Sequence, residues 1–175
     1  MRYLVASFLL INAVHIYLLA AHRANRNLTI SERAAKNNAA LALYVAGHLI
    51  NGALFAIFAY SFFIHKSNEP LLFVVAALGV ISEWSQALIP ARGKYDKPHT
   101  MIAYLMSALM TLLGAMSAIL LPTSSNLQRL ILAITFIILW GYPLAAVLPR
   151  RYFWVIEMVN INLFYLQMFI LIQLT

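Results

Sequence analysis

Long apolar stretches alternate with short polar connections along the whole chain. Six stretches are each close to the ~20 residues that an α-helix needs to cross a hydrocarbon core of ~30 Å. They are Tyr3–Ala21, Ala39–Ile64, Leu71–Ile89, Thr100–Leu121, Leu127–Leu148 and Phe153–Leu174. The pattern predicts an all-α fold, a polytopic integral membrane bundle of six transmembrane helices, with residues 1–175 forming a single domain.

The longest connection contains a helix-start signal. Thr29, followed by Glu32 three residues later, fits the capping box in which each side chain bonds the backbone of the other residue. We expect a basic helix here that carries Arg33 and Lys36 along the membrane surface and runs straight into the second stretch.

The basic residues are distributed unevenly between the two sides of the predicted bundle. Nine of the 12 Lys and Arg residues follow the first, third and fifth stretches, and the other three lie on the opposite side. Basic residues in short loops mark the cytoplasmic side, so we expect both termini outside and the basic loops in the cytoplasm. The nine are Arg23, Arg26, Arg33, Lys36, Arg92, Lys94, Lys97, Arg150 and Arg151.

Composition narrows the functional classes further. The chain is 63% hydrophobic and 10% charged, with a net charge of +7 that topology and contact with anionic lipid explain. We therefore predict the lipid bilayer as a partner and no nucleic acid. The absence of cysteine excludes disulfides, thiolate metal sites and thiol redox chemistry.

Polar residues interrupt four of the six stretches in pairs. The two members of each pair are three residues apart, which puts them on the same side of a helix. At 1.5 Å per residue, one ionisable member of each pair lies roughly 8–14 Å from the basic side. His99 directly precedes the fourth stretch, near the basic side. The pairs are Asn12 and His15, His48 and Asn51, Glu83 and Gln86, and Glu157 and Asn160.

This common depth predicts a polar, cytoplasm-facing pocket within the membrane, with these nine residues as candidate ligand-binding residues. A carboxylate in hydrocarbon costs several kcal/mol unless it is paired, protonated or hydrated, which makes Glu83 the strongest candidate. We predict that the pocket binds or transports a small molecule, a lipid headgroup or an ion, with proton exchange at Glu83 and Glu157, and we predict no cofactor.

Three alternatives stay open, and whether the protein is an enzyme stays open with them. His15, His48, His99 and Glu83 could hold a zinc ion that hydrolyses lipid-like substrates, although no HxxxH or HExxH spacing is present. His15 and His48 could instead be axial ligands of haem b. The polar groups could also serve only to join helices, in a non-catalytic scaffold or partner subunit.

The segment around Glu83 is similar to a known group. Ser82, Glu83, Gln86, Pro90, Asp96, Pro98 and His99 are the residues that carry the similarity. The segment resembles six-helix prokaryotic membrane proteins with a domain of unknown function, distantly grouped with the DRAM and Frag families. The resemblance implies a six-helix bundle in a prokaryotic plasma membrane and no particular reaction. It leaves open whether the protein is a homo-oligomer or a subunit of a membrane complex.

Overall fold

The prediction of an all-α fold is confirmed. The computed structural model describes residues 1–21, 28–122 and 124–174, while the side chains of residues 142, 143, 145, 146 and 174 lie outside this description. Every regular element of the described residues is helical. The six predicted stretches correspond in order to α1 (Arg2–Ala21), α3 (Asn38–Ala59), α4 (Pro70–Leu88), α5 (Asp96–Leu120), α6 (Ser125–Val147) and α7 (Phe153–Leu174).

Short elements connect or extend these helices. A π-helical segment, η1 (Tyr60–Lys66), extends α3. Two 3-10 turns, η2 (Gly93–Tyr95) and η3 (Arg150–Tyr152), lead into α5 and α7. The remaining element is α2 (Ile30–Ala34), which lies between α1 and α3.

Five helical segments are long and apolar enough to cross a membrane. Large apolar side chains such as Leu9, Ile81 and Phe136 are exposed on the outside of the bundle. A surface of this kind is unusual for a protein that lives in water alone. Within the side chains that the structure describes, α6 has a continuous apolar stretch over Ser125–Gly141. The five segments are Arg2–Ala21, Asn38–Lys66, Pro70–Leu88, Gly93–Leu120 and Arg150–Gln173.

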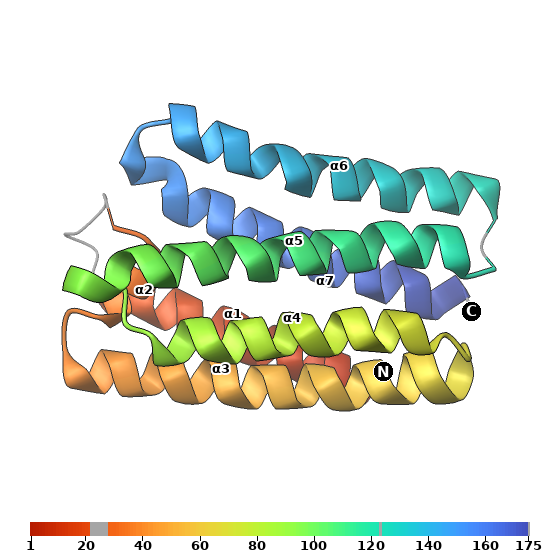
Figure 1. Cartoon of the computed structure of the whole chain (residues 1–175), viewed down its shortest axis with the longest axis horizontal. Coiled ribbons are helices and arrows are strands. Elements are labelled where there is room, and N and C mark those ends of the chain that lie inside the picture. The colour runs from red at the N-terminus through yellow and green to blue at the C-terminus, as the bar shows by residue number, and fades with distance from the viewer. Residues whose placement is uncertain (22–27, 123, 175) are drawn as a thin grey trace.

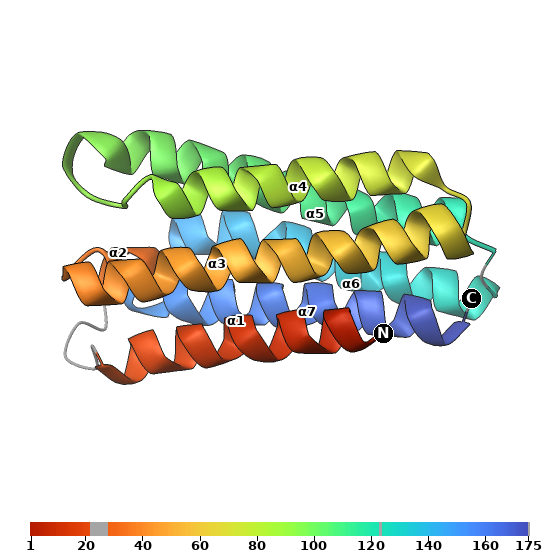
Figure 2. The ribbon, with the colours of Figure 1, turned by 90° about the horizontal axis from the view of Figure 1, so that it is seen from below.

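Five of the long helices form a closed ring, and the sixth packs outside it. Around the ring, α1 contacts α3, α3 contacts α4, α4 contacts α5, α5 contacts α7, and α7 contacts α1. The outer helix, α6, packs against α5 and α7. Figures 1 and 2 show the helices running along one long axis, with α6 at one edge of the bundle. The ring encloses the space that most of the candidate residues line.

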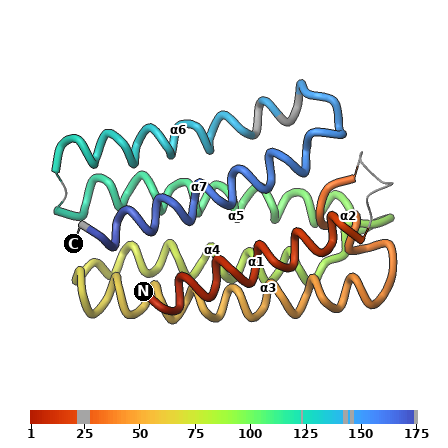
Figure 3. Tube along the Cα trace, turned by 180° about the vertical axis from the view of Figure 1, so that it is seen from behind, coloured from red at the N-terminus to blue at the C-terminus, as the bar shows by residue number. Residues whose placement is uncertain are grey.

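The connections alternate between the two ends of the bundle. Both termini lie at one end, and α2, η2 and η3 lie at the other (Figures 1 and 3). We call the second end the basic end, because Arg33, Lys94 and Arg150 belong to these three elements. Arg23 and Arg26 fall outside the described residues.

The capping box of α2 is confirmed, but the helix does not run on into the next one. Thr29 accepts a hydrogen bond from the Glu32 N–H, and the Glu32 carboxylate accepts one from the Thr29 N–H. Residues 35–37 then break the helix, and Asn37 starts α3 by accepting a bond from the Ala40 N–H at 2.7 Å. Asparagine favours the non-helical N-cap position, so the expected continuous helix divides at this residue.

Candidate functional site

Three of the predicted residues form a continuous hydrogen-bonded chain across three helices. His15 Nε2 of α1 lies 3.2 Å from His48 Nε2 of α3. His48 Nδ1 lies 2.8 Å from Glu83 Oε1 of α4. All three side chains are buried. The ring order of the helices explains the contact, because α3 packs between α1 and α4.

The partners of each nitrogen define the tautomers of the two rings. A carboxylate oxygen only accepts hydrogen bonds, so His48 Nδ1 donates to Glu83 when Glu83 is ionised. In a neutral His48 ring Nε2 then accepts, and His15 Nε2 is the donor. His15 Nδ1 is consequently an acceptor, and it has no hydrogen-bond partner.

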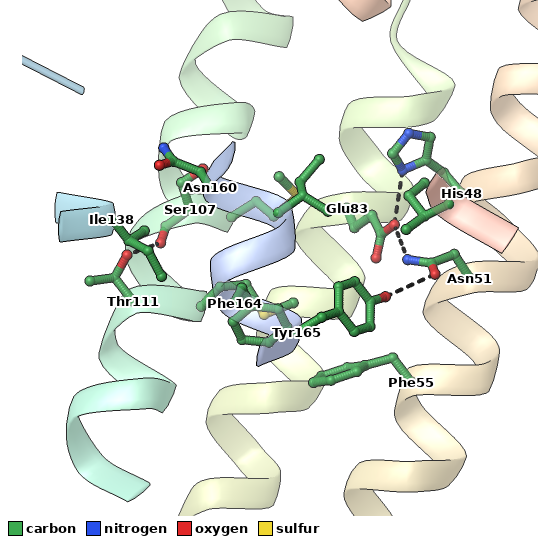
Figure 4. A pocket seen from close by; sticks show the side chains of 14 residues that line it. His48, Asn51, Phe55, Glu83, Ser107, Thr111, Ile138, Asn160, Phe164 and Tyr165 are labelled. Atoms are coloured by element: carbon green, nitrogen blue, oxygen red, sulfur yellow. Dashed lines mark hydrogen bonds and ion pairs between the residues drawn. The ribbon is translucent and has the colours of Figure 1, made fainter. Parts of the chain in front are cut away.

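Asn51 binds the same carboxylate oxygen of Glu83 as His48 does. Its Nδ2 donates to Glu83 Oε1 at 2.9 Å, and its Oδ1 accepts from Ser7 at 2.7 Å and from Tyr165 at 3.0 Å. Figure 4 shows Glu83 between His48, Asn51 and Tyr165, with both of its dashed bonds at one carboxylate oxygen. The network thus extends to α7 through the Tyr165 hydroxyl.

Two cavities meet at this network. The outer cavity, of about 280 Å³, lies at the basic end and is lined by His15, Tyr44, Gln86, His99 and Glu157 among others. The inner cavity, of about 90 Å³, is lined by apolar residues such as Ile11 and Phe55 and by polar residues that include Asn51, Glu83 and Tyr165. Figure 4 shows the inner cavity between Glu83 and the opposing group of Ser107, Thr111 and Asn160. The residues that line both cavities are His48, Met106, Ser107, Asn160 and Ile161.

Gln86 and His99 form a second polar contact in the wall of the outer cavity. His99 Nδ1 lies 2.6 Å from the Ile89 carbonyl and must donate to it. The neutral ring then accepts at Nε2 from the Gln86 amide nitrogen, 3.3 Å away. This orientation of the amide leaves Gln86 Oε1 as a buried acceptor with no hydrogen-bond partner.

Glu157 holds α2 against the bundle. Its Oε2 accepts a hydrogen bond from the Ile30 N–H at 2.9 Å. A second contact joins the same element to η3, since Arg150 lies 2.9 Å from Glu32. Burial lowers the pKa of the Arg33 guanidinium in α2 below its usual value, and the nearby Glu157 offsets only part of this shift. Glu157 therefore lines the outer cavity and also orders the helix that lies beside it.

The remaining two candidates behave differently. Asn160 lines both cavities and lies against α6 at Gly141, where a Cβ atom would come within 2.7 Å of the Asn160 amide. Asn12 does not line either cavity. Its side chain donates to the Phe8 carbonyl and accepts from Asn162 of α7. The structure thus brings eight of the nine predicted residues to the two cavities or their walls and directs Asn12 to a helix contact.

Three residues of the site are missing from the sequence prediction. Ser7 and Tyr165 complete the Asn51 network, and Tyr44 receives a bond from Gln86 Nε2 at 3.4 Å. Tyrosine is amphipathic and counts as apolar in a hydropathy pattern. The sequence does contain one indication that Tyr165 belongs to the site. Tyr165 follows Glu157 by eight residues, which places both on one side of the helix.

The positions of the histidines can be compared with what a zinc site and a haem b site require. Among the described residues, no three His, Cys, Asp or Glu side chains are grouped so that they could hold one metal ion. His99 bonds Gln86 and Ile89 rather than joining His15 and His48. Axial haem ligands face each other across the iron and the porphyrin, whereas the His15 and His48 rings bond each other directly. This arrangement does not fit haem.

Comparison with known proteins does not assign this chain to a family. No family model, curated protein or solved structure matches this chain, so the resemblance to the DRAM and Frag group stays a prediction. The interpretation of the site rests on its geometry.

Proposed function

We propose that this protein is an integral membrane protein of six transmembrane helices that binds or carries a small polar molecule, lipid headgroup or ion. In this proposal both termini lie outside, and the basic end faces the cytoplasm. The pocket is the outer cavity, and binding is accompanied by proton exchange at Glu83.

The observation that carries the proposal is the polar outer cavity inside a bundle with an apolar outer surface. A helix bundle that needed polar residues only to join helices would bond them to one another and close the space between them. Here about 280 Å³ stays open beside His15, Gln86 and Glu157. Two of the lining residues also keep a buried atom, His15 Nδ1 and Gln86 Oε1, without a protein partner. Open space with unsatisfied polar groups is typical of a binding site.

The chain from His15 to Glu83 supports proton exchange. A proton that joins His15 Nδ1 allows His15 to pass its Nε2 proton to His48 Nε2. His48 in turn passes its Nδ1 proton to Glu83 Oε1. Both rings end neutral in the opposite tautomers, and Glu83 becomes a neutral acid, so charge and protons balance.

The relay ends at Glu83 and does not continue through the bundle. Beyond the carboxylate, the next group is the Asn51 amide, which is not an acid or base at ordinary pH. Past Ser7 and Tyr165 the core is built from apolar side chains such as Leu4, Phe55 and Phe58. The relay therefore loads and unloads Glu83 from the outer cavity.

A pair of single-cysteine variants tests the pocket and the membrane together. The chain contains no cysteine, so an introduced thiol gives an unambiguous signal. Ser107 lines both cavities, while its neighbour Ala108 is exposed on the outside of α5. In inside-out membrane vesicles we expect a charged thiol reagent to modify Ser107→Cys and not Ala108→Cys. Ala108 would face lipid, where a thiolate does not form.

The alternatives give different labelling. A water-soluble protein would be modified at Ala108→Cys, because that position is exposed. A bundle closed to water would be modified at neither position. Ser117→Cys serves as the buried control, since Ser117 is 0% exposed and lines neither cavity.

A further inference from the structure

We infer that the ligand of the outer cavity is a small cation, such as a protonated amine. This inference rests on the proposed function, because it names the chemical class of ligand for the same cavity. It is carried by the charge of the lining residues, by their unpaired acceptors and by their aromatic rings.

The lining charge is acidic although the whole chain is basic. Three carboxylates, Glu32, Asp96 and Glu157, line the outer cavity beside one arginine, Arg150. Arg150 already bonds Glu32 at 2.9 Å, so these two charges offset each other. Asp96 and Glu157 remain, and Glu83 lies behind His48 in the inner cavity. This stands against a net charge of +7 for the whole sequence.

Other basic groups at this end do not line the cavity, and they include Arg92, Lys94 and Lys97 beside Asp96. Arg33 interacts electrostatically with Glu157 and donates from Nε to the Leu28 carbonyl, but it does not line the cavity. The histidines of the wall are engaged in hydrogen bonds within the protein: His99 with Ile89 and Gln86, and His48 with Glu83 and His15. The charged residues that line the cavity are therefore mainly carboxylates.

The unpaired polar atoms of the wall are hydrogen-bond acceptors. Gln86 is 8% exposed and His15 is 2% exposed, and both line the cavity. Their atoms without a protein partner are the Gln86 amide oxygen and His15 Nδ1, which is an acceptor in the neutral tautomer. An ammonium group has N–H donors and no acceptor, so a wall that holds unpaired acceptors favours it over an anion. Tyr44, Tyr104 and Phe153 add aromatic rings, whose faces attract cations.

The proton relay can supply a negative charge that balances the charge of the cation. When Glu83 is protonated, the relay is neutral, and when Glu83 is ionised, it carries one negative charge. A positive ligand favours the ionised state, so its arrival releases the proton through His48 and His15 into the outer cavity. We accordingly expect cation binding to be accompanied by proton release.

The charge preference of cysteine labelling tests this inference without knowing the natural ligand. In the Ser107→Cys variant, we compare labelling rates by two methanethiosulfonates, one with a trimethylammonium group and one with a sulfonate. The matched control is Tyr95→Cys, since Tyr95 lies on η2 at the same end, is 46% exposed and does not line the cavity. It experiences the same membrane surface charge. Clefts lined by one sign of charge raise the local concentration of the opposite ion by about tenfold or more.

We expect the ratio of cationic to anionic rate to be about tenfold higher at Ser107→Cys than at Tyr95→Cys. Adding Glu157→Gln should lower the ratio toward that of the control. n-Butylammonium should protect Ser107→Cys from labelling, and butyrate should not. A ratio at or below that of the control, with both reagents reacting, would overturn the cation inference and leave the pocket standing. Failure of both reagents at Ser107→Cys alone would instead defeat the proposed pocket.

Discussion

Glu83 accepts a hydrogen bond from His48 at 2.8 Å in the interior of the helix ring. Both side chains are nearly inaccessible, at 7% exposure each. The same carboxylate oxygen also accepts from Asn51. A carboxylate in this position is held by two donors, so it contributes to the fold as well as to the proposed exchange of protons.

Substitution of Glu83 should separate these two contributions. Glu83→Gln keeps an oxygen acceptor for His48 and Asn51, so we expect nearly wild-type thermal stability but no proton release on cation binding. Glu83→Leu leaves both donors without an acceptor, and we expect a loss of about 1–3 kcal/mol for each. Unfolding in detergent measures the stability of both variants. A Leu variant as stable as the wild type would mean that Glu83 has no structural part.

The relay predicts specific tautomers for three histidines. At a pH where the rings are neutral and Glu83 is ionised, we expect His48 and His99 to carry the proton on Nδ1 and His15 to carry it on Nε2. Nitrogen NMR of histidine-labelled protein distinguishes the two forms, and the variants His15→Phe and His99→Phe assign the signals. Protonation of Glu83 should switch His48 and His15 together to the opposite tautomers, and two neutral rings that both carry the proton on Nε2 would contradict the proposed relay.

The contacts of α2 differ in strength. Glu157→Ala leaves the buried Ile30 N–H without its acceptor, and an unpaired buried donor costs about 1–3 kcal/mol. Arg150→Ala breaks an ion pair in which the arginine side chain is 61% exposed, a kind worth about 0–1 kcal/mol. We expect amide hydrogen exchange in Ile30–Ala34 to accelerate strongly in the first variant and slightly in the second. Equal acceleration would show that Glu157 does not anchor α2.

The proposed topology has its own test. Cysteines introduced at the exposed Asn68 and Ser124 lie at the end that carries the termini, and those at Lys36 and Lys94 lie at the basic end. In intact cells an impermeant thiol reagent should modify the first pair and not the second, and permeabilisation should expose the second. The reverse pattern would turn the cavity outward.

Much of the site follows from the spacing of polar residues. The common depth of His15, His48 and Glu83 predicts that they lie together, and they form one hydrogen-bonded chain. Depth alone does not say which atoms meet, because that depends on the order of helices around the ring. Spacing alone predicts that Asn12 points into the pocket beside His15, but Asn12 lines neither cavity. Residues three apart are offset by about 60° around a helix, and this offset turns Asn12 toward Asn162 of α7.

The sequence pattern is weakest where one element covers another. The α2 helix was predicted from its capping box, but its division from α3 depends on Asn37, and its position depends on Glu157. The hydropathy pattern does not indicate Tyr44 and Tyr165, because their rings count as apolar although their hydroxyls bond Gln86 and Asn51. Contacts between distant residues such as Ile30 and Glu157 have no local signal in the sequence.

A second polar junction, remote from the cavities, joins α5, α6 and α7. Gln167 is 0% exposed, and its amide nitrogen donates to the Ile131 carbonyl at 2.9 Å and to the Thr135 hydroxyl at 2.5 Å. Gly114 of α5 faces this amide, and a Cβ atom there would lie 2.5 Å from Gln167 Oε1. The glycine therefore provides the space in which Gln167 holds the outer helix to the ring.

Gly114→Ala should consequently destabilise the bundle through Gln167. The added methyl group must push the amide away from Ile131 and Thr135, at a cost of about 1–3 kcal/mol for the buried groups left unpaired. In a Gln167→Ala background the methyl meets no amide, so Gly114→Ala should cost much less there. Unfolding of the two single variants and the double variant in detergent gives the coupling energy. A cost of Gly114→Ala that is equal in both backgrounds would show that helix packing elsewhere, and not the Gln167 amide, requires the glycine.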